Sequence, residues 1–470
     1  MEDSGLKETV LVGLSSQGVE VRASPVRLTR YLVVFEIYRE GSLLQVSEVL
    51  SDFRIIIQDR MLYSGRAIVK NLIDTGLVIL CEASLEDSWT DAELLASDPR
   101  PERVQREFNE FFRQWQKVYR ILPEYKLLSS DIHSFLTDFR LWVEQVELGI
   151  RALPAGDRNE RERETAASIA NAAFQGVDAL FDQFEKIAAS IEPELRPAHE
   201  VYVRRQLHPL VLCAPFAFRS VQKPLGYAGD YEMVNMILRD PHEGGSLFAK
   251  VLNRWFVKQP PAEAHRNRIN YLVEQLSNET LRTRNAGGLC RVFNAGCGPA
   301  GEIQRFLADS ELSNHVKLTL LDFNEETINH ARSVLETVRH KHARTTQIDF
   351  TKKSVVQLLR GRSKTAVGGQ NYDFVYCAGL FDYLPDSVCR QLVGVFYDML
   401  APGGLLVLTN VEPSNPIRHW LGYVLDWHLI YRNAKQMMQL CPDSSLTEQC
   451  RVRADATGVN LFLEIRRPPA

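Results

Sequence analysis

The stretch Val292-Phe293-Asn294-Ala295-Gly296-Cys297-Gly298-Pro299-Ala300-Gly301-Glu302 decides how the C-terminal part of the chain is interpreted. It starts with apolar, strand-forming residues and continues with Gly296, Gly298 and Gly301 in the spacing G-x-G-x-x-G. Glycine has no Cβ, so the backbone of such a turn can come close to a ligand. The stretch therefore predicts a strand-to-helix turn that holds a nucleoside.

Strand-like and helical segments alternate on both sides of this turn. The apolar, strand-like runs lie at 291–295, 316–321, 346–349, 373–377 and 404–410. This alternation predicts a doubly wound parallel sheet, an α/β Rossmann-like domain, over residues 285–470. Near its end, 447–453 and 460–466 flank the turn Ala456-Thr457-Gly458 and predict an antiparallel hairpin added to the sheet.

The remainder of the chain divides into a β-rich part and a helical part. Short β-branched and aromatic runs with turn residues such as Gly41-Ser42 between them predict a small β-barrel over 1–96. Ser97-Asp98-Pro99-Arg100-Pro101 is typical of a linker. Apolar residues at three- and four-residue steps predict helices over 102–220, and we assign 221–284 to a lid loop and connecting helices.

Composition limits the functional classes. The chain has 470 residues, 45% hydrophobic and 24% charged, which is ordinary for a globular protein too long for one core. A formal charge of -4 argues against binding nucleic acid. No apolar run approaches the ~18 to 20 residues of a membrane-spanning helix, so we expect no stable membrane insertion.

The cysteines and the N-terminus indicate the compartment. The eight cysteines form no C-x-x-C pair and no metal-ligand spacing, so we expect free thiols and no metal site. The acidic, polar start of the chain is not typical of a signal peptide. We therefore expect a cytoplasmic protein; its oligomeric state is not set by the sequence.

An acidic residue and the first helical turn narrow the choice of nucleoside. Asp322 follows Gly301 by 21 residues, at the end of the next predicted strand, where a carboxylate can accept ribose hydroxyls. A pyrophosphate would need free N–H groups and a positive helix N-terminus. Pro299 removes one N–H and Glu302 adds a negative charge there. Both disfavour a phosphate but not S-adenosylmethionine, which has a positive sulfonium.

Further residues near the ends of the predicted strands are candidates for cofactor contacts. Asp349, after the third strand, is expected to accept from the adenine amino group, with Phe350 on the ring; a helix N-cap is the alternative for Asp349. The complete set of candidates on these strands is Asn294, Gly296, Gly298, Gly301, Asp322, Phe323, Asp349, Phe350 and Cys377.

A loop rich in glycine, tyrosine and acidic residues, 223–232, precedes a predicted helix. We interpret it as a lid in which Tyr227 and Tyr231 exclude water and either Asp230 or Glu232 faces the methionine ammonium. A plain surface turn is the alternative.

If S-adenosylmethionine is the cofactor, the segment after the fifth predicted strand is a candidate for binding the second reactant. Residues 420–432 are aromatic and aliphatic, with the cations Arg418, His419, His428 and Arg432 within or beside them. An apolar wall with a few cations suits an amphiphilic acid, whose carboxylate is ionised at pH 7 and needs no general base. We expect Tyr431 and Arg432 to contact the acceptor. A core-facing helix with solvated charges is the alternative.

The order of these motifs resembles that of the class I S-adenosylmethionine-dependent methyltransferases over 285–470. That family carries a glycine loop, an acid after strand two, an Asp after strand three and a terminal antiparallel hairpin. The resemblance implies S-adenosylmethionine as cofactor. Asn294 departs from the pattern, because the family often has an acidic residue at that position.

Taken end to end, the chain resembles bacterial synthases of the 3-hydroxypalmitic acid methyl ester quorum signal. The resemblance is carried by segments 25–30, 50–54, 224–232 and 427–432. It implies carboxyl O-methylation of a 3-hydroxy fatty acid. The alternatives are a methyltransferase acting on a protein or small amine, and a nicotinamide oxidoreductase.

The N-terminal barrel resembles a PilZ-type domain, a family that binds cyclic di-GMP through an R-x-x-x-R arm and a D/N-x-S-x-x-G turn. Here Arg27 and Arg30 are one residue too close, and after Asn71 the serine position is Ile73. We therefore expect a degenerate scaffold that docks on the helical region. A cyclic di-GMP-responsive signalling protein with a methyltransferase-fold output is the alternative.

Overall fold

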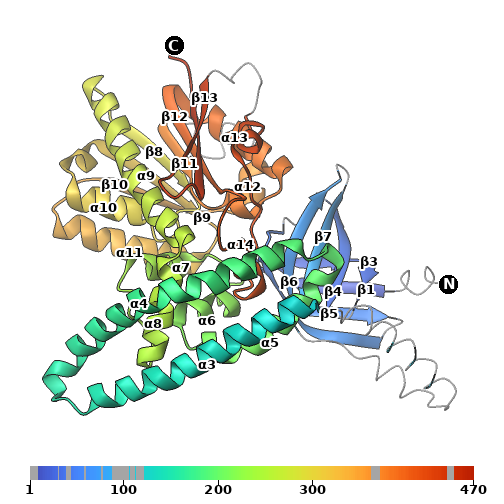
Figure 1. Ribbon diagram of the computed structural model, residues 1–470. Helices are drawn as coiled ribbons and strands as arrows, with labels where there is room; N and C mark the ends of the chain where they lie inside the picture. Colours follow the sequence, from blue (N-terminus) through green and yellow to red (C-terminus); the bar gives the residue numbers. More distant parts are fainter. Residues whose placement is uncertain are drawn as a thin grey trace. The chain divides into compact units, whose positions relative to one another are not determined.

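The computed structural model divides into two compact units (Figure 1). The first comprises 1–228, 240–259 and 416–428, and the second 229–239, 260–415 and 429–470. The residues described are 9–29, 31–38, 44–57, 60–75, 78–86, 105, 109, 112, 121–360, 371–441 and 449–469. The turn expected at Gly41-Ser42, the linker expected at 97–101, and Arg30 lie outside them.

The first unit begins with an antiparallel sheet that is nearly closed, as the β-rich composition predicts. Its strands are β1 (Thr9–Leu14), β2 (Glu20–Ala23), β3 (Pro25–Leu28), β4 (Leu32–Tyr38), β5 (Val49–Ile57), β6 (Arg60–Asp74) and β7 (Val78–Leu85). They pair in the order β2-β1-β5-β6-β7-β4-β3. Side chains alternate between partly buried and fully buried along β7, and Phe35, Phe53 and Ile55 fill the interior.

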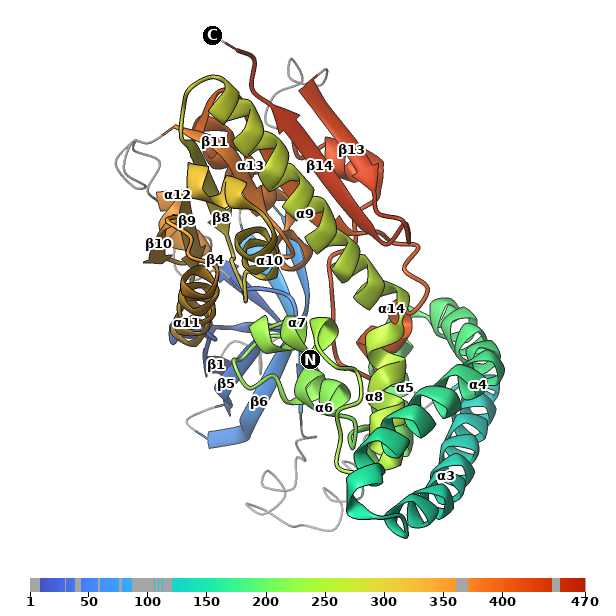
Figure 2. The same ribbon diagram turned by 90° about the vertical axis from the view of Figure 1, so that its left-hand side faces the viewer.

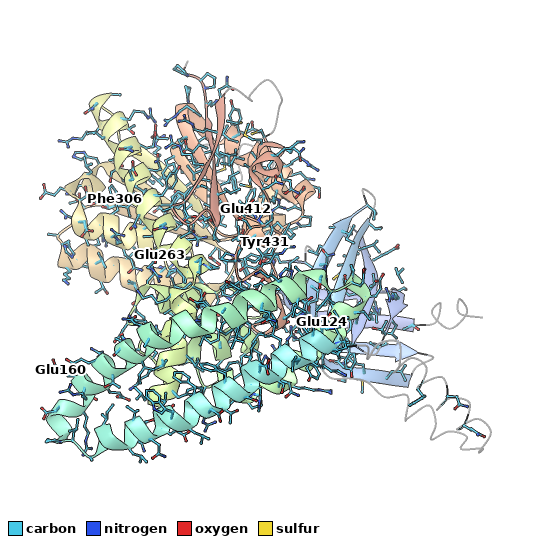
Figure 3. All side chains as sticks on the ribbon, viewed as in Figure 1. Glu124, Glu160, Glu263, Phe306, Glu412 and Tyr431 are labelled. Atoms are coloured by element: carbon cyan, nitrogen blue, oxygen red, sulfur yellow. The ribbon has the colours of Figure 1, made fainter. Side chains whose placement is uncertain are left out.

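Two long helices follow, α3 (Pro123–Arg151) and α4 (Ala155–Ser190). They form a hairpin, with Glu124 at one end of α3 and Glu160 near the opposite end (Figure 3). Ile132, Leu136 and Val143 lie on the buried face of α3, as the three- and four-residue spacing predicts. Helix α4 includes the charged run 158–164, which is mostly exposed.

Polar contacts join the barrel to the helical part of its own unit, where Lys70 Nζ lies 3.3 Å from Glu200 Oε2 in α5 (Arg196–Val211). The unit also contains α6 (Pro215–Gln222), α8 (Leu247–Lys258) and α14 (Arg418–Tyr423). Arg66 Nη2 donates to the carbonyl of Gln222 at 3.0 Å, and the amide of Val49 donates to the carbonyl of Gly226 at 2.7 Å.

The second unit is built on a mixed sheet in the order β10-β9-β8-β11-β12-β14-β13. The strands are β8 (Cys290–Ala295), β9 (Val316–Asp322), β10 (Gln347–Lys352), β11 (Tyr372–Cys377), β12 (Leu400–Val411), β13 (Cys450–Ala454) and β14 (Asn460–Arg466). The first five are parallel, and β14 pairs antiparallel with both β12 and β13. The predicted doubly wound sheet and its terminal hairpin are confirmed.

Helices cover both faces of this sheet (Figure 2). The helices of the unit are α7 (Tyr231–Leu238), α9 (Pro260–Asn285), α10 (Gly301–Asp309), α11 (Glu325–Lys341), α12 (Val355–Arg360), α13 (Asp386–Asp398) and α15 (Ala434–Met438). On one face Phe306 of α10 packs with Leu272 of α9 and Leu335 of α11. On the other face Phe293 of β8 lies 6.2 Å from the ring of Phe396 in α13.

Among the residues that the structure describes, no helix combines the length and apolar character needed to cross a bilayer.

Candidate functional site

The carboxyl ends of β8 and β11 mark the centre of the candidate site. The chain leaves β8 toward β9 and β10 and returns to β11 on the other side, so the strand order reverses between β8 and β11. Open α/β sheets bind ligands at such a switch point. Gly296 follows β8 and Gly379 follows β11, and both have positive φ, 71° and 101°.

The glycine loop has the conformation that its sequence predicts, but its three glycines differ in function. Gly296 (φ 71°) and Gly298 (φ 52°) adopt the left-handed region that favours glycine. A side chain on Gly298 would meet nothing within 4 Å, so this position faces open space. A Cβ on Gly301 would lie 3.1 Å from Leu238 and 3.3 Å from Ile269, so Gly301 permits close helix packing instead.

Asp322 ends β9 beside this loop. Its Oδ2 accepts from the amide of Gly298 at 3.3 Å, and its Oδ1 accepts from the amide of Asn324 at 3.0 Å. The residue is only 6% exposed, and burial raises the pKa of its carboxyl to about 6. The sequence prediction of an acid at the end of the second strand is confirmed in position; its contact with a ribose stays a prediction.

A buried carboxyl lies beside Asn294, where the class I family often has an acid. Glu302, in the first turn of α10, accepts from the Tyr376 hydroxyl at 2.7 Å and from Asn294 Nδ2 at 3.3 Å. Burial raises the pKa of the Glu302 carboxyl. The following helix therefore places a carboxyl beside position 294.

Arg268 of α9 brings a buried cation to the same end of the sheet. It is 9% exposed, and a Cβ on Gly379 would lie 3.1 Å from its Nη1. Its guanidinium contacts the ring of His265, whose pKa burial and neighbouring arginines hold well below 6.5. Within the described part of the chain, no carboxylate lies within 4.0 Å of Arg268. Burial lowers the pKa of its guanidinium, and the carboxyls of Asp382 and Glu302 oppose this shift.

The structure corrects the assignment of Arg432 to the acceptor. Arg432 is 1% exposed, and all five of its guanidinium N–H groups have acceptors. The acceptors are Asp386 Oδ1 (2.8 Å from Nε, 2.7 Å from Nη2), Asn410 Oδ1 (2.7 Å) and the carbonyls of Phe381 (2.7 Å) and Leu384 (2.6 Å). The side chain has no donor left for a substrate carboxylate. It fixes the loop after β11 to β12 instead.

This fixed loop contains another buried carboxyl, that of Asp382. Its Oδ1 accepts from the amide of Val411 at 2.7 Å, and its carbonyl accepts from the amide of Ile430 at 2.7 Å. Burial raises the pKa of Asp382 to about 6, against the opposing effect of Arg268 and Arg432. Tyr431 lies between these anchors and is half-buried; its contact with an acceptor stays a prediction.

Two histidines of the expected acceptor wall have structural partners. His419 Nδ1 lies 2.8 Å from Glu185 Oε2. His428 lies 3.2 Å from Asp426, and burial lowers its pKa to about 4. Both belong to the first unit, so residues 416–428 contribute to that unit's packing.

The expected lid residues fall on both sides of a unit boundary. Tyr227 belongs to the first unit, whereas Asp230 and Tyr231 belong to the second. Asp230 caps α7, because its Oδ1 accepts from the amides of Glu232 and Met233 at 3.0 Å. The capping contact gives Asp230 a structural function that was not predicted from the sequence.

Tyr231 is tied to helix α11. Its hydroxyl donates to Glu326 at 2.8 Å, and its ring stacks on His330 at 4.5 Å. The contacts of Tyr227 and Tyr231 with a cofactor stay predictions.

Asp349 does not lie where the sequence pattern predicts it. It lies inside β10, where it pairs in register with Thr319 of β9. Asp322 of β9 pairs instead with Lys352, three residues further along β10. The carboxylate of Asp349 forms an ion pair with Lys317 at 3.2 Å. The prediction that Asp349 follows the strand was wrong, because β10 extends to Lys352.

The structure also places the three other residues that the sequence predicts to contact the cofactor. Phe350 lies against the core beneath the guanidinium of Arg332, 5.0 Å away. Phe323 is half-buried between β9 and α11. Cys377, fully buried at the end of β11, pairs in register with Ala295, and burial raises its pKa.

No protein-family model and no curated protein matches the sequence. Several solved structures align with the chain. A possible exported protein from Bordetella parapertussis aligns at 17% identity over 64% of this chain and 97% of its own, with a TM-score of 0.41. Magnesium protoporphyrin IX methyltransferase from Synechocystis PCC 6803 with bound SAH aligns at 15% over 50% and 92%, with a TM-score of 0.34.

A third solved structure is the N-methyltransferase NodS from Bradyrhizobium japonicum WM9 in complex with S-adenosyl-L-homocysteine. It aligns at 17% identity over 51% of this chain and 98% of its own, with a TM-score of 0.30.

Arg268 and Asp382 were not predicted from the sequence, and Glu302 was given only a repulsive role. Arg268 lies in a helix 28 residues before Gly296, and no local motif marks it. Asp382 did have a signal, because it follows the fourth predicted strand by five residues, as a site residue can in such a fold.

Proposed function

We propose that the second unit binds S-adenosylmethionine and transfers its methyl group. The observation that carries the proposal is the set of charges at the switch point. The carboxylate of Asp322 suits ribose hydroxyls, Glu302 suits the methionine ammonium, and the guanidinium of Arg268 suits the methionine carboxylate. The sequence resemblance to class I methyltransferases supports the same cofactor.

The cofactor would supply a methyl group on a positive sulfur. In the transfer, the carbon–sulfur bond breaks and its electron pair returns to sulfur, while an acceptor lone pair forms the new bond to carbon. The residues of this chain would bind and orient the two reactants, because in-line displacement depends on alignment.

Calorimetric titration with S-adenosylmethionine tests the cofactor. We expect Asp322→Ala and Arg268→Gln each to weaken binding by about ten-fold or more, since each removes a charged hydrogen bond of about 1.5–3 kcal/mol. Arg305→Gln is the matched control, because Arg305 is exposed on α10 and its substitution should leave the affinity unchanged. Unchanged binding by both site variants would refute the assignment.

We further propose that the acceptor is the carboxylate of a 3-hydroxy fatty acid, giving a methyl ester. The end-to-end sequence resemblance supports this substrate, and a carboxylate needs no general base at pH 7. The test is mass spectrometry after incubation with labelled S-adenosylmethionine and free 3-hydroxy fatty acids. A labelled ester is expected. If the protein binds S-adenosylmethionine but forms no ester, the fatty-acid substrate is refuted, and protein and amine acceptors should be tested next.

A further inference from the structure

Arg268 of α9 is a buried cation whose hydrogen-bond donors are mostly unused by the protein. A guanidinium carries five N–H donors. Within the described part of the chain, the one hydrogen-bond partner of Arg268 is Nε2 of His265, three residues earlier in the same helix. Arg432, which is also buried, has acceptors for all five of its donors. Arg268 therefore keeps donors that can bind a ligand.

The place of Arg268 in the fold indicates which end of a ligand it contacts. The strands that end at the candidate site lie in the order β9-β8-β11. Asp322 ends β9, the glycine loop follows β8, and Gly379 follows β11. A Cβ on Gly379 would lie 3.1 Å from Arg268 Nη1, so the guanidinium lies against the backbone after β11. A ligand with its ribose at Asp322 that crosses the glycine loop therefore brings its other end to Arg268.

The surroundings leave the positive charge of Arg268 available to such a ligand. The carboxyls that act on it electrostatically are those of Asp382 and Glu302. Asp382 accepts from the amide of Val411, and Glu302 accepts from the hydroxyl of Tyr376. Both carboxyls are thus bound to other donors. A ligand carboxylate can form a charge-assisted, bidentate pair with the guanidinium.

His265 holds one nitrogen of this guanidinium. Its Nε2 contacts Arg268 Nη2, and because an arginine N–H group only donates, Nε2 is the acceptor and carries no proton. Burial and the neighbouring Arg268 and Arg266 hold the pKa of His265 well below 6.5, so the ring is neutral at pH 7. A neutral acceptor orients the guanidinium without cancelling its charge, as a carboxylate partner would.

We propose that His265 is a positioning residue, which orients Arg268 to bind the carboxylate of the methionine group of S-adenosylmethionine. The inference rests on the proposed function, because it concerns how the same site recognises its cofactor. Its consequence is selectivity. The site prefers a cofactor that carries the carboxylate, and this preference is lost when the guanidinium is no longer held.

Calorimetry with the full-length protein at pH 7.5 compares S-adenosylmethionine with its decarboxylated analogue. The two ligands share the adenosine, the sulfonium and the amine, and they differ in the carboxylate alone. We expect the wild type to bind S-adenosylmethionine about ten-fold more tightly or better, as a charge-assisted hydrogen bond would give. In His265→Leu the affinity for S-adenosylmethionine should fall about ten-fold, whereas the affinity for the analogue should change little.

Three further variants control this result. His265→Gln should keep most of the preference, because its amide oxygen can take the place of Nε2. His315→Leu is the matched control, since His315 is half-buried and directly precedes β9, at the end of that strand opposite to Asp322. Both affinities should stay unchanged in it. If His265→Leu does not fold, His265→Asn replaces it, because the shorter amide does not reach Arg268 Nη2.

The outcomes separate this inference from the proposed function. If the wild type binds neither ligand, the cofactor assignment is refuted and the inference with it. If the wild type binds both ligands equally, Arg268 does not bind the carboxylate, and the inference is overturned while the cofactor stands. The same holds if the wild type prefers S-adenosylmethionine but loss of the His265 acceptor weakens both ligands equally or weakens neither, because His265 then has a structural function only.

Discussion

At the scale of single residues, the buried carboxyl of Asp322 makes the stability of the protein depend on pH. The pKa of its carboxyl is about 6, against an ordinary value of 3.8, because burial disfavours its charge. The contribution of this group to the free energy of unfolding is therefore full below about pH 4 and is lost as the pH rises through about 6.

We expect Asp322→Asn to raise the stability of the cofactor-free protein by about 1–3 kcal/mol at pH 7.5, since the neutral amide avoids the burial of a charge. The gain should shrink as the pH falls from 7 toward 4. Urea unfolding of both proteins across this range measures it. If the gain in stability does not depend on pH, burial of the Asp322 charge is not its cause. We also expect Asp322→Asn to bind S-adenosylmethionine more weakly than the wild type.

Arg432 supports a second prediction about a residue. The five N–H donors of its guanidinium all have acceptors, which come from the loop after β11, from β12 and from α13. Arg432→Lys should therefore cost about 3–5 kcal/mol of unfolding free energy, since an ammonium has three donors and cannot span this set. Arg453→Lys, an exposed arginine in β13, is the control. If Arg432→Lys unfolds like wild type, the structural function assigned to Arg432 is wrong.

At the scale of elements, the glycine loop contains two kinds of glycine with different expected phenotypes. Gly301→Ala should lower the free energy of unfolding by about 1–3 kcal/mol, because its Cβ would press on Leu238 and Ile269 of α7 and α9. Gly298→Ala meets no neighbour and should cost only the strain of positive φ, about 1–2 kcal/mol, while weakening S-adenosylmethionine binding. Thermal unfolding and calorimetry of the same two variants separate the effects. Equal losses of binding would mean that both glycines face the cofactor.

Most elements of the second unit were predictable from sequence, whereas the partners of their charged residues were not. Strands β8, β9 and β11 coincide with their apolar runs within one residue at each end, because buried parallel strands are continuously hydrophobic. Asp349 was misplaced because β10 is an edge strand whose polar residues resemble a loop. Arg432 was misassigned because its acceptors include carbonyls and Asn410, which only the folded chain assembles.

Residues 416–428 form an element held inside the first unit by a buried charged cluster. Asp426 accepts from Arg204 at 2.6 Å and from Lys223 at 2.9 Å, and also contacts Lys70. These three cations hold the pKa of Asp426 well below its ordinary value. The stability that Asp426 contributes is present above its ordinary pKa of 3.8 and is lost as the pH falls through the lower folded value.

Asp426→Asn should therefore destabilise the protein by about 3–5 kcal/mol at pH 7.5, because three buried cations lose their counterion. Lys223→Met in the same chain should restore part of the loss by removing one of them. Urea unfolding measures both. Glu86→Gln is the control, since its ion pair with Arg66 is exposed and should be worth at most about 1 kcal/mol. A loss no larger than that of the control would contradict the cluster's importance.

At the scale of the whole molecule, the chain passes between the two units five times, at 228/229, 239/240, 259/260, 415/416 and 428/429. The sequence motifs suggest a methyltransferase domain that is continuous from about 285. Nothing local in 416–428 shows that it packs with another unit, because its partners Arg204 and Lys70 are more than 200 residues away.

This connectivity predicts how fragments behave. A fragment of residues 229–470 keeps 416–428 but loses most of the first unit, so Trp420, Leu421 and Val424, all buried within that unit, should become exposed. We expect the fragment to aggregate, since an exposed apolar patch favours association. Replacing 416–428 by a glycine- and serine-rich linker of equal length should reduce the aggregation, because it removes those side chains. Size-exclusion chromatography with light scattering measures both fragments. A monomeric, unmodified fragment would show that 416–428 does not need the first unit to be covered.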